Sequence, residues 1–345
     1  MPEPFNSRLG EIMFKAETAK GTQATDANLV DGTFSNVRAF DVSYTPDVRF
    51  HDRRIVSNSL SRNAHILGQT LGRITFKTEL VKLAATATQD RWGPLLEACG
   101  CPFTSGTGVY APTTDRTLHK TLTMYVMTAG SGTTGNNTIR VGMRGCAGTF
   151  KLVGKPGLPA MLEWEFFGVS DNNDADATPS WALKFTDDAL NTVTHDPVVA
   201  ASFHGIALTW NAFSAKCSTM EFDAGNVVVP REDLSSDQGI LCYAVIDRAP
   251  MLKIDPEAVL LTTQAFFTQL VDGTEVAVAW DFVQPATASP SVALRTFAFD
   301  APKAQLRSVT HGDRNGIGIF ACEAALNRSA AAGEDEWTLA ITGAA

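Results

Sequence analysis

Short stretches in which apolar and polar residues alternate, divided by turn-forming residues, run through most of this chain. In LEWEFFG, for example, Leu162, Trp164 and Phe166 fall on one side of an extended strand. Glu163 and Glu165 fall on the other side. Clusters of Gly, Pro, Asn and Asp separate such stretches, as turns do. The pattern predicts a mainly β protein whose strands have one wet face.

Two segments have helical spacing instead. A short helix is predicted over residues 89–99, where apolar side chains recur at i, i+3, i+4 and i+7. A longer helix is predicted over residues 256–271, with Asp255 as its N-cap and an Asp-Gly pair at its end. Each helix follows a strand pattern and precedes several more.

Length and charge narrow the classes of function. The chain has 345 residues, with 28 Lys+Arg and 37 Asp+Glu, so its formal net charge is −9. This length predicts two domains, each large enough to bury its own core. An acidic balance argues against a protein that grips nucleic acid by its phosphates, which requires a basic surface. It still allows a protein that lets nucleic acid slide past.

No motif indicates catalysis, a metal or a cofactor. The six cysteines lack the second close pair that a zinc site needs, and the six histidines show no HExxH. A GxGxxG match at residues 130–135 precedes a strand pattern, so it is interpreted as a hairpin loop. Glu163 and Glu165 leave a glycosidase as a remote alternative. The N-terminus lacks a secretory pattern, and no apolar run of about 18 residues predicts a membrane span.

The predicted elements occur twice in the same order: strand, long polar loop, strand, helix, further strands. Arg54 and Arg231 lie 177 positions apart, and Phe76 and Leu252 lie 176 apart. Chance recurrence of strands and turns is the alternative. Farther along, the matching segments are offset by 154 to 155 positions, as at Leu152 and Leu306 and at Leu162 and Ile317.

We therefore predict an extended N-terminal arm over residues 1–35, a first β domain over 36–180 and a second over 181–345. The arm is inferred because its polar and small residues show no sustained period. Two similar domains joined head to tail can take neighbouring places in a ring, so three chains would supply six places. The two long loops carry charges of both signs, which favours a protein partner over a purely solubilising role.

Six segments in order along the chain carry a family resemblance: FKAETAKGTQAT, GPLLEACG, MRGCAGTFKLV with LEWEFFG, MEFDAGNVVVPREDL, VIDRAP and EDEW. Together they resemble the major tail (tail tube) proteins of long-tailed phages with non-contractile tails. The stretch from Cys101 to Thr138 matches no segment of that family.

The resemblance implies two tandem tail-tube-like β-barrel or sandwich domains, each with one flanking α-helix, closing into rings that stack into a hollow tube. Family members with one such domain form six-membered rings, so duplication implies three chains per ring with pseudo-sixfold symmetry. The implied partners are further copies, the tape-measure protein, the tail terminator and distal tail proteins, and double-stranded DNA in transit. The implied location is the virion tail, assembled in the host cytoplasm. A single-ring tail-completion, distal tail or baseplate protein is the alternative, and a carbohydrate-active enzyme is less favoured.

On this hypothesis, alternate polar residues of the strands face the bore, and an acidic wall repels DNA so that passage is fast. Lysines in such a wall have a second interpretation, as partners of acidic residues on the next subunit. The lumen-facing candidates are Lys77, Glu79, Glu163, Glu165, Lys253 and Asp255. Ring closure is expected from strand pairing between subunits, and stacking from the arm and the two long loops. The candidates for these contacts are Phe14, Lys15, Glu17, Asp52, Arg53, Arg54, Arg62, Arg231, Glu232 and Asp233.

Overall fold

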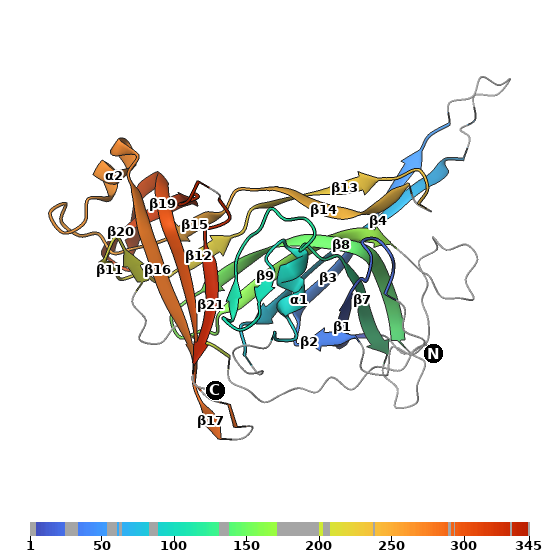
Figure 1. Cartoon of the computed structure of the whole chain (residues 1–345), viewed down its shortest axis with the longest axis horizontal. Helices are drawn as coiled ribbons and strands as arrows, with labels where there is room; N and C mark the ends of the chain where they lie inside the picture. Colours follow the sequence, from blue (N-terminus) through green and yellow to red (C-terminus); the bar gives the residue numbers. More distant parts are fainter. Residues whose placement is uncertain are drawn as a thin grey trace.

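The chain folds around one large antiparallel sheet of 17 strands, seen in a computed structural model (Figure 1). Within the described residues it is mainly β, as the sequence predicted, with two short helices. The structure describes residues 5–24, 34–53, 61, 64–82, 89–130, 138–170, 200–202, 208–236, 239–288, 291–292, 294–331 and 333–343.

The elements of the first half run up to residue 170. In chain order they are β1 (Phe5–Ala16), β2 (Ser35–Val37), β3 (Phe40–His51), β4 (Ile66–Glu79), α1 (Gly93–Ala98), β5 (Phe103–Thr104), β6 (Val109–Tyr110), β7 (Leu122–Gly130), β8 (Thr138–Gly154) and β9 (Met161–Ser170).

The elements of the second half begin at residue 208. They are β10 (Leu208–Trp210), β11 (Phe213–Ala215), β12 (Met220–Asp223), β13 (Asn226–Glu232), β14 (Ile240–Arg248), β15 (Met251–Ile254), α2 (Phe266–Asp272), β16 (Glu275–Gln284), β17 (Thr287–Ala288), β18 (Ser291–Val292), β19 (Arg295–Arg314), β20 (Ile317–Leu326) and β21 (Thr338–Gly343).

Both halves have one strand order. The main strands of the first half lie side by side as β3-β4-β9-β8-β7-β1. Those of the second half lie as β12-β15-β20-β19-β16-β10. Numbered by position along the chain within each half, both orders read 2-3-6-5-4-1. A helix follows the third strand in both. The repeat of element order in the sequence is therefore also a repeat of topology.

The ladder registers correct the sequence alignment of the two halves near their ends. Lys77 lies opposite Glu163, and Lys253 lies opposite Glu323, so the last strands are offset by 160 positions instead of 155. The larger offset arises because β19 and β20 form a longer hairpin: Ser308 and Glu323, which lie opposite each other, are 15 positions apart, whereas Lys151 and Glu163 are 12 apart. Apolar alternation alone does not reveal such a change in hairpin length.

The two halves share one hydrophobic core, which corrects the prediction of two separate cores. At their junction, Phe222 on β12 packs 5.9 Å from Phe150 on β8, between ring centroids. It also lies 4.7 Å from Phe299 and 5.0 Å from Trp337. These four side chains come from both halves, so neither half buries its apolar surface alone.

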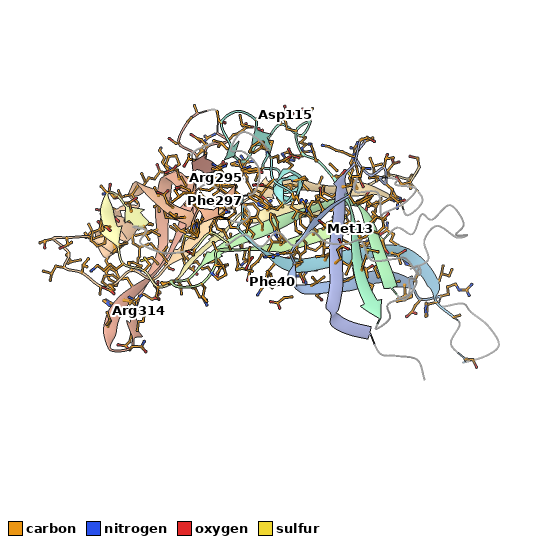
Figure 2. All side chains as sticks on the ribbon, turned by 90° about the horizontal axis from the view of Figure 1, so that it is seen from below. Met13, Phe40, Asp115, Arg295, Phe297 and Arg314 are labelled. Carbon is orange, nitrogen blue, oxygen red and sulfur yellow. The ribbon has the colours of Figure 1, made fainter. Side chains whose placement is uncertain are left out.

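Residues 5–16 form the paired strand β1, so the prediction of an unpacked arm is wrong for this part of residues 1–35. β1 pairs with β7 from Gly10 opposite Thr128 onward. Ile12, Met13 and Phe14 are all fully buried. Ile12 and Phe14 face the main core, while Met13, labelled in Figure 2, faces a second cluster on the other side. Burial on both faces removes the alternation that would have revealed the strand.

The helices are shorter than predicted. α1 lies within the predicted residues 89–99, but α2 occupies only the end of the predicted residues 256–271. The carbonyl of Pro256 accepts a hydrogen bond from Phe320, which draws this part of the chain toward β20 instead of into a helix. Gly273 ends α2 in the left-handed conformation, at φ 63°.

Candidate functional site

The solvent face of the sheet carries a row of opposite charges that runs across the strands. We call this row the charge ladder; its members are Asp41, Lys77, Glu163, Lys151, Glu221, Asp223, Lys253 and Glu323. Each member lies opposite or next to one of opposite sign on the neighbouring strand. Cross-strand pairs of this kind stabilise a sheet and fix its register.

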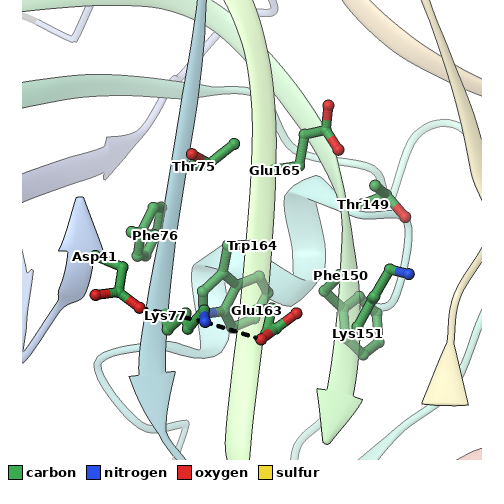
Figure 3. Close-up of a pocket in the computed structure, with 10 residues that line it drawn as sticks. All are labelled: Asp41, Thr75, Phe76, Lys77, Thr149, Phe150, Lys151, Glu163, Trp164 and Glu165. Atoms are coloured by element: carbon green, nitrogen blue, oxygen red, sulfur yellow. Dashed lines mark ion pairs between the residues drawn. The ribbon is translucent and has the colours of Figure 1, made fainter. Parts of the chain in front are cut away.

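In the first half, Lys77 is the centre of the ladder. Its Nζ atom lies 3.2 Å from the Asp41 carboxylate and 3.3 Å from that of Glu163 (Figure 3). Its hydrogen bonds to these two carboxylates raise the pKa of Lys77, so its charge is firmly held. Lys151 on β8 lies opposite Glu163 and continues the row.

The ladder crosses from one half to the other at Lys151. Residues 151–154 of β8 pair antiparallel with β12 of the second half. The Lys151 Nζ lies 3.0 Å from Glu221 and 2.9 Å from Asp223, both on β12. Burial lowers the pKa of Lys151, but these carboxylates outweigh that effect and raise it. A cation of the first half is thus neutralised by anions of the second.

The second half repeats the arrangement. Glu221 lies opposite Lys253 on β15, and Lys253 lies opposite Glu323 on β20. The Lys253 Nζ and the Glu323 carboxylate are 3.3 Å apart, the same distance as between Lys77 and Glu163. Lys77 and Lys253 therefore occupy matching places and pair with carboxylates of their own chain.

The other lumen-facing candidates lie around the ladder. Glu165 pairs with Arg73 at 2.6 Å, and Glu79 lies 4.0 Å from Arg38. Asp255 instead points inward, where its carboxylate accepts hydrogen bonds from the backbone N–H groups of Ser218 and Thr219 and pairs with Arg314. Burial raises the pKa of Asp255, but these hydrogen bonds and the guanidinium reverse the effect and leave it lowered.

A shallow groove of about 320 Å³ lies along the first half of the ladder. Figure 3 shows Asp41, Lys77, Lys151, Glu163 and Glu165 around it. Three aromatic side chains, those of Phe76, Phe150 and Trp164, also line the groove. The groove presents fixed charges of both signs on a stiff sheet, with cations that are already paired.

Three candidates for contacts between subunits make contacts within their own chain. Phe14 is fully buried in the core. The Lys15 ammonium lies 5.4 Å from the centre of the Phe34 ring. Glu17 accepts four hydrogen bonds from its own chain. The end of the β1 segment is thus held within the first half.

Glu17 ties three segments together. Its Oε1 atom accepts bonds from the Gly145 N–H at 2.7 Å and the Thr123 hydroxyl at 3.0 Å. Its Oε2 atom accepts bonds from the Gly21 N–H at 2.8 Å and the Thr121 hydroxyl at 2.5 Å. Burial raises the pKa of this carboxyl, although the four hydrogen bonds oppose the rise.

Five of the seven remaining candidates lie at the ends of two long hairpins. Asp52 and Arg53 follow β3, and the Arg53 guanidinium donates to the Ala64 carbonyl at 3.1 Å. In the second half, the exposed residues Arg231 and Glu232 end β13. Asp233 accepts hydrogen bonds from the backbone N–H and the hydroxyl of Ser235. Arg54 and Arg62 lie outside the described residues.

The second of these hairpins, β13–β14, lies across the sheet of the first half (Figure 1). Ile240 and Tyr243 pack against Leu71 and Val169 in a separate apolar cluster. The rings of Tyr243 and Phe167 stack 6.0 Å apart. The segment that the sequence predicted as a long polar loop therefore contains the strands β13 and β14. This hairpin helps to hold the two halves together.

Sequence reasoning missed five of the eight members of the charge ladder, namely Asp41, Lys151, Glu221, Asp223 and Glu323. Their alternation with buried neighbours was visible in segments such as FKLV and MEFD. What the sequence did not provide was the order of the strands, because pairing between residues about 70 to 90 positions apart leaves no local signal.

Within the described residues, no group of three His, Cys, Asp or Glu side chains is placed to hold a metal ion, and no helix is long and apolar enough to cross a membrane. All six cysteines are free thiols, and five are buried. Comparison with protein-family models and with curated protein sequences found no match.

Proposed function

We propose that this chain is the structural subunit of a hollow tube, the tail tube of a long-tailed phage with a non-contractile tail. Three chains form each ring, and their six similar halves give it pseudo-sixfold symmetry. The rings stack, enclose the tape-measure protein during assembly and later conduct double-stranded DNA. The tail terminator and distal tail proteins bind the two ends of the tube.

One observation carries this proposal: two halves with the same strand order are joined by a strand of the second pairing with a strand of the first. A joint of this kind is heterologous, because the two partners contribute different edges. Heterologous joints repeat around an axis and close into rings when the rotation fits. The chain thus contains, within itself, a contact of the kind that a ring needs.

The charge ladder supports a role as the wall of a DNA channel. A basic wall would hold DNA by releasing its counterions. Here the lysines of the ladder are neutralised by carboxylates 2.9–3.3 Å away, and the chain as a whole is acidic. We propose that the sheet face with the ladder lines the bore and lets DNA pass without binding it.

Negative-stain electron microscopy of the purified chain over a range of concentrations tests this function. The proposal predicts long tubes of uniform width with a stain-filled bore. Isolated rings that never elongate would instead support a single-ring tail-completion, distal tail or baseplate protein. A chain that stays monomeric at every concentration would contradict both functions.

A further inference from the structure

The two halves are joined by pairing between β12 and β8, and the strands that correspond to these two in the other half do not pair in this way within the chain. Within the chain, β12 pairs with the final residues of β8, from Met220 opposite Gly154 to Asp223 opposite Lys151. In the shared strand order, β12 is the second strand of its half and β8 is the fifth. The matching strands are β3, the second of the first half, and β19, the fifth of the second half.

Both of these strands have an edge with no partner strand among the described residues. β3 pairs with β4 along one edge only. β19 pairs with β16 up to Gln305 and with β20 on the opposite edge, so residues 306–314 leave one edge unpaired within the described part of the chain. Long unpaired edges invite pairing with another chain, and natural proteins cover or block them.

The registers within each half fix how the two edges correspond to the internal joint. Lys151 lies opposite Glu163, and Ser308 lies opposite Glu323. Because Glu323 of the second half corresponds to Glu163 of the first, Ser308 corresponds to Lys151. On β3, Ser43 lies opposite Thr75 of β4. Thr75 corresponds to Met251 of β15, which lies opposite Asp223. Ser43 therefore corresponds to Asp223.

We propose that β3 of one copy pairs antiparallel with β19 of the next, with Ser43 opposite Ser308 and Phe40 opposite Thr310. This inference rests on the proposed function, because it is the contact that would close the ring. It repeats between copies the strand pairing that joins the two halves within one copy. The occupant of each free edge is thus a second copy of the same chain.

Charge at the two edges fits this pairing. The ladder begins with a carboxylate, Asp41, on β3. Beyond Glu323 at its other end lies Arg307, an exposed residue in a bulge of β19. Leu306 and Val309 on either side face the core, which places Arg307 and Ser308 on the ladder face. Arg307 has no ion-pair partner among the described residues, so it is free to bind Asp41 of the next copy.

Exposed apolar side chains on β3 also favour pairing at this edge of the sheet. Phe40 and Val42, which flank the irregularity at Asp41 in β3, are 43% and 39% exposed. Figure 2 shows Phe40 on the same side of the molecule as Arg314, at the end of β19, with Asp115 on the opposite side. Pairing of β3 with β19 would cover these apolar side chains as β8 covers β12 within the chain.

Cysteine cross-linking tests the register directly. One preparation carries Ser43→Cys and a second carries Ser308→Cys, so a disulfide in the mixture forms only between copies. Directly opposite residues have Cβ atoms about 4.5–5.5 Å apart, close to what a disulfide needs. The control pairs Ser43→Cys with Ser214→Cys, an exposed site on β11. Native thiols compete little, because five are buried and burial raises the pKa of Cys217 to about 12.

A double-mutant cycle tests the ion pair. Arg307→Glu should raise the critical concentration for assembly about fivefold, because it places like charges opposite each other. Adding Asp41→Asn should recover part of that loss, since the repulsion is then removed. Arg116→Glu, the same charge change on an exposed loop, is the matched control and should leave assembly unchanged.

The outcomes separate this contact from the function on which it rests. A dimer on a denaturing gel from the Ser43 and Ser308 mixture, absent from the control, together with non-additive charge variants, supports the contact. Tubes that form without the cross-link, or with additive effects of the two charge changes, would overturn the contact and leave the tube standing. A wild-type chain that never assembles would overturn both.

Discussion

Single residues decide how the first half is held together, and Glu17 is the clearest case. The family resemblance placed Glu17 at a contact between subunits, because FKAETAKGTQAT reads as a polar arm. In the structure its carboxylate gathers two backbone N–H groups and two hydroxyls from its own chain. A hydrogen-bonding role of this kind depends on segments more than 100 positions away, so no local pattern predicts it.

The variant Glu17→Gln should destabilise the fold by about 1–3 kcal/mol. Both carboxylate oxygens accept from a backbone N–H, so an amide in either orientation turns an NH₂ group toward a donor. Urea denaturation followed by circular dichroism measures the change. Glu232→Gln, at an exposed site, is the control and should alter the free energy of unfolding by less than about 0.5 kcal/mol.

The same variant carries a pH prediction. Burial raises the pKa of Glu17, so the folded state holds this proton at a pH where the unfolded chain has lost it. The stability that this group contributes should therefore fall as pH rises from the ordinary Glu range through the raised pKa. The stability difference between wild type and Glu17→Gln should shrink over that range, and a difference that grows with pH would contradict the assignment.

At the scale of elements, the sequence predicted strands well where one face is wet and failed where both are buried. LEWEFFG forms β9 with the expected alternation of buried and half-buried residues. The strand β1 was missed because Met13 and Phe14 are buried on opposite faces. Likewise, the predicted helix over residues 256–271 was shortened by backbone contacts with a strand 60 positions away, which propensity does not encode.

Deletion of residues 1–16 should abolish folding of the chain instead of yielding a soluble, assembly-deficient monomer. It removes the β1 partner of β7 and three fully buried side chains, Ile12, Met13 and Phe14. Solubility and near-ultraviolet circular dichroism report the result. A deletion variant with a native-like spectrum would show that β1 is dispensable and would restore the arm model.

At the scale of the whole molecule, the duplication was visible in the sequence only as an order of elements. What the sequence did not contain was the way the halves meet. That joint depends on the pairing of β8 with β12 and on aromatic rings from both halves. The two halves are therefore topological units that share a single core.

The shared core predicts that the two halves unfold together. Phe222→Ala removes the ring at the junction and should cost about 3–5 kcal/mol. Tryptophan fluorescence and far-ultraviolet circular dichroism should give coincident transitions in both wild type and variant. Leu260→Ala, at a site 77% exposed, is the control with little expected effect. Two separate transitions in the wild type would mean that each half has its own core.

In the proposed tube, two related halves of one chain take neighbouring, equivalent places around a bore. End-on class averages from cryo-electron microscopy of the assembled protein would show this arrangement. We expect rings of six similar β lobes around an open channel, contributed by three chains. Rings in which the two halves occupy different radii, or assemblies without a channel, would contradict it.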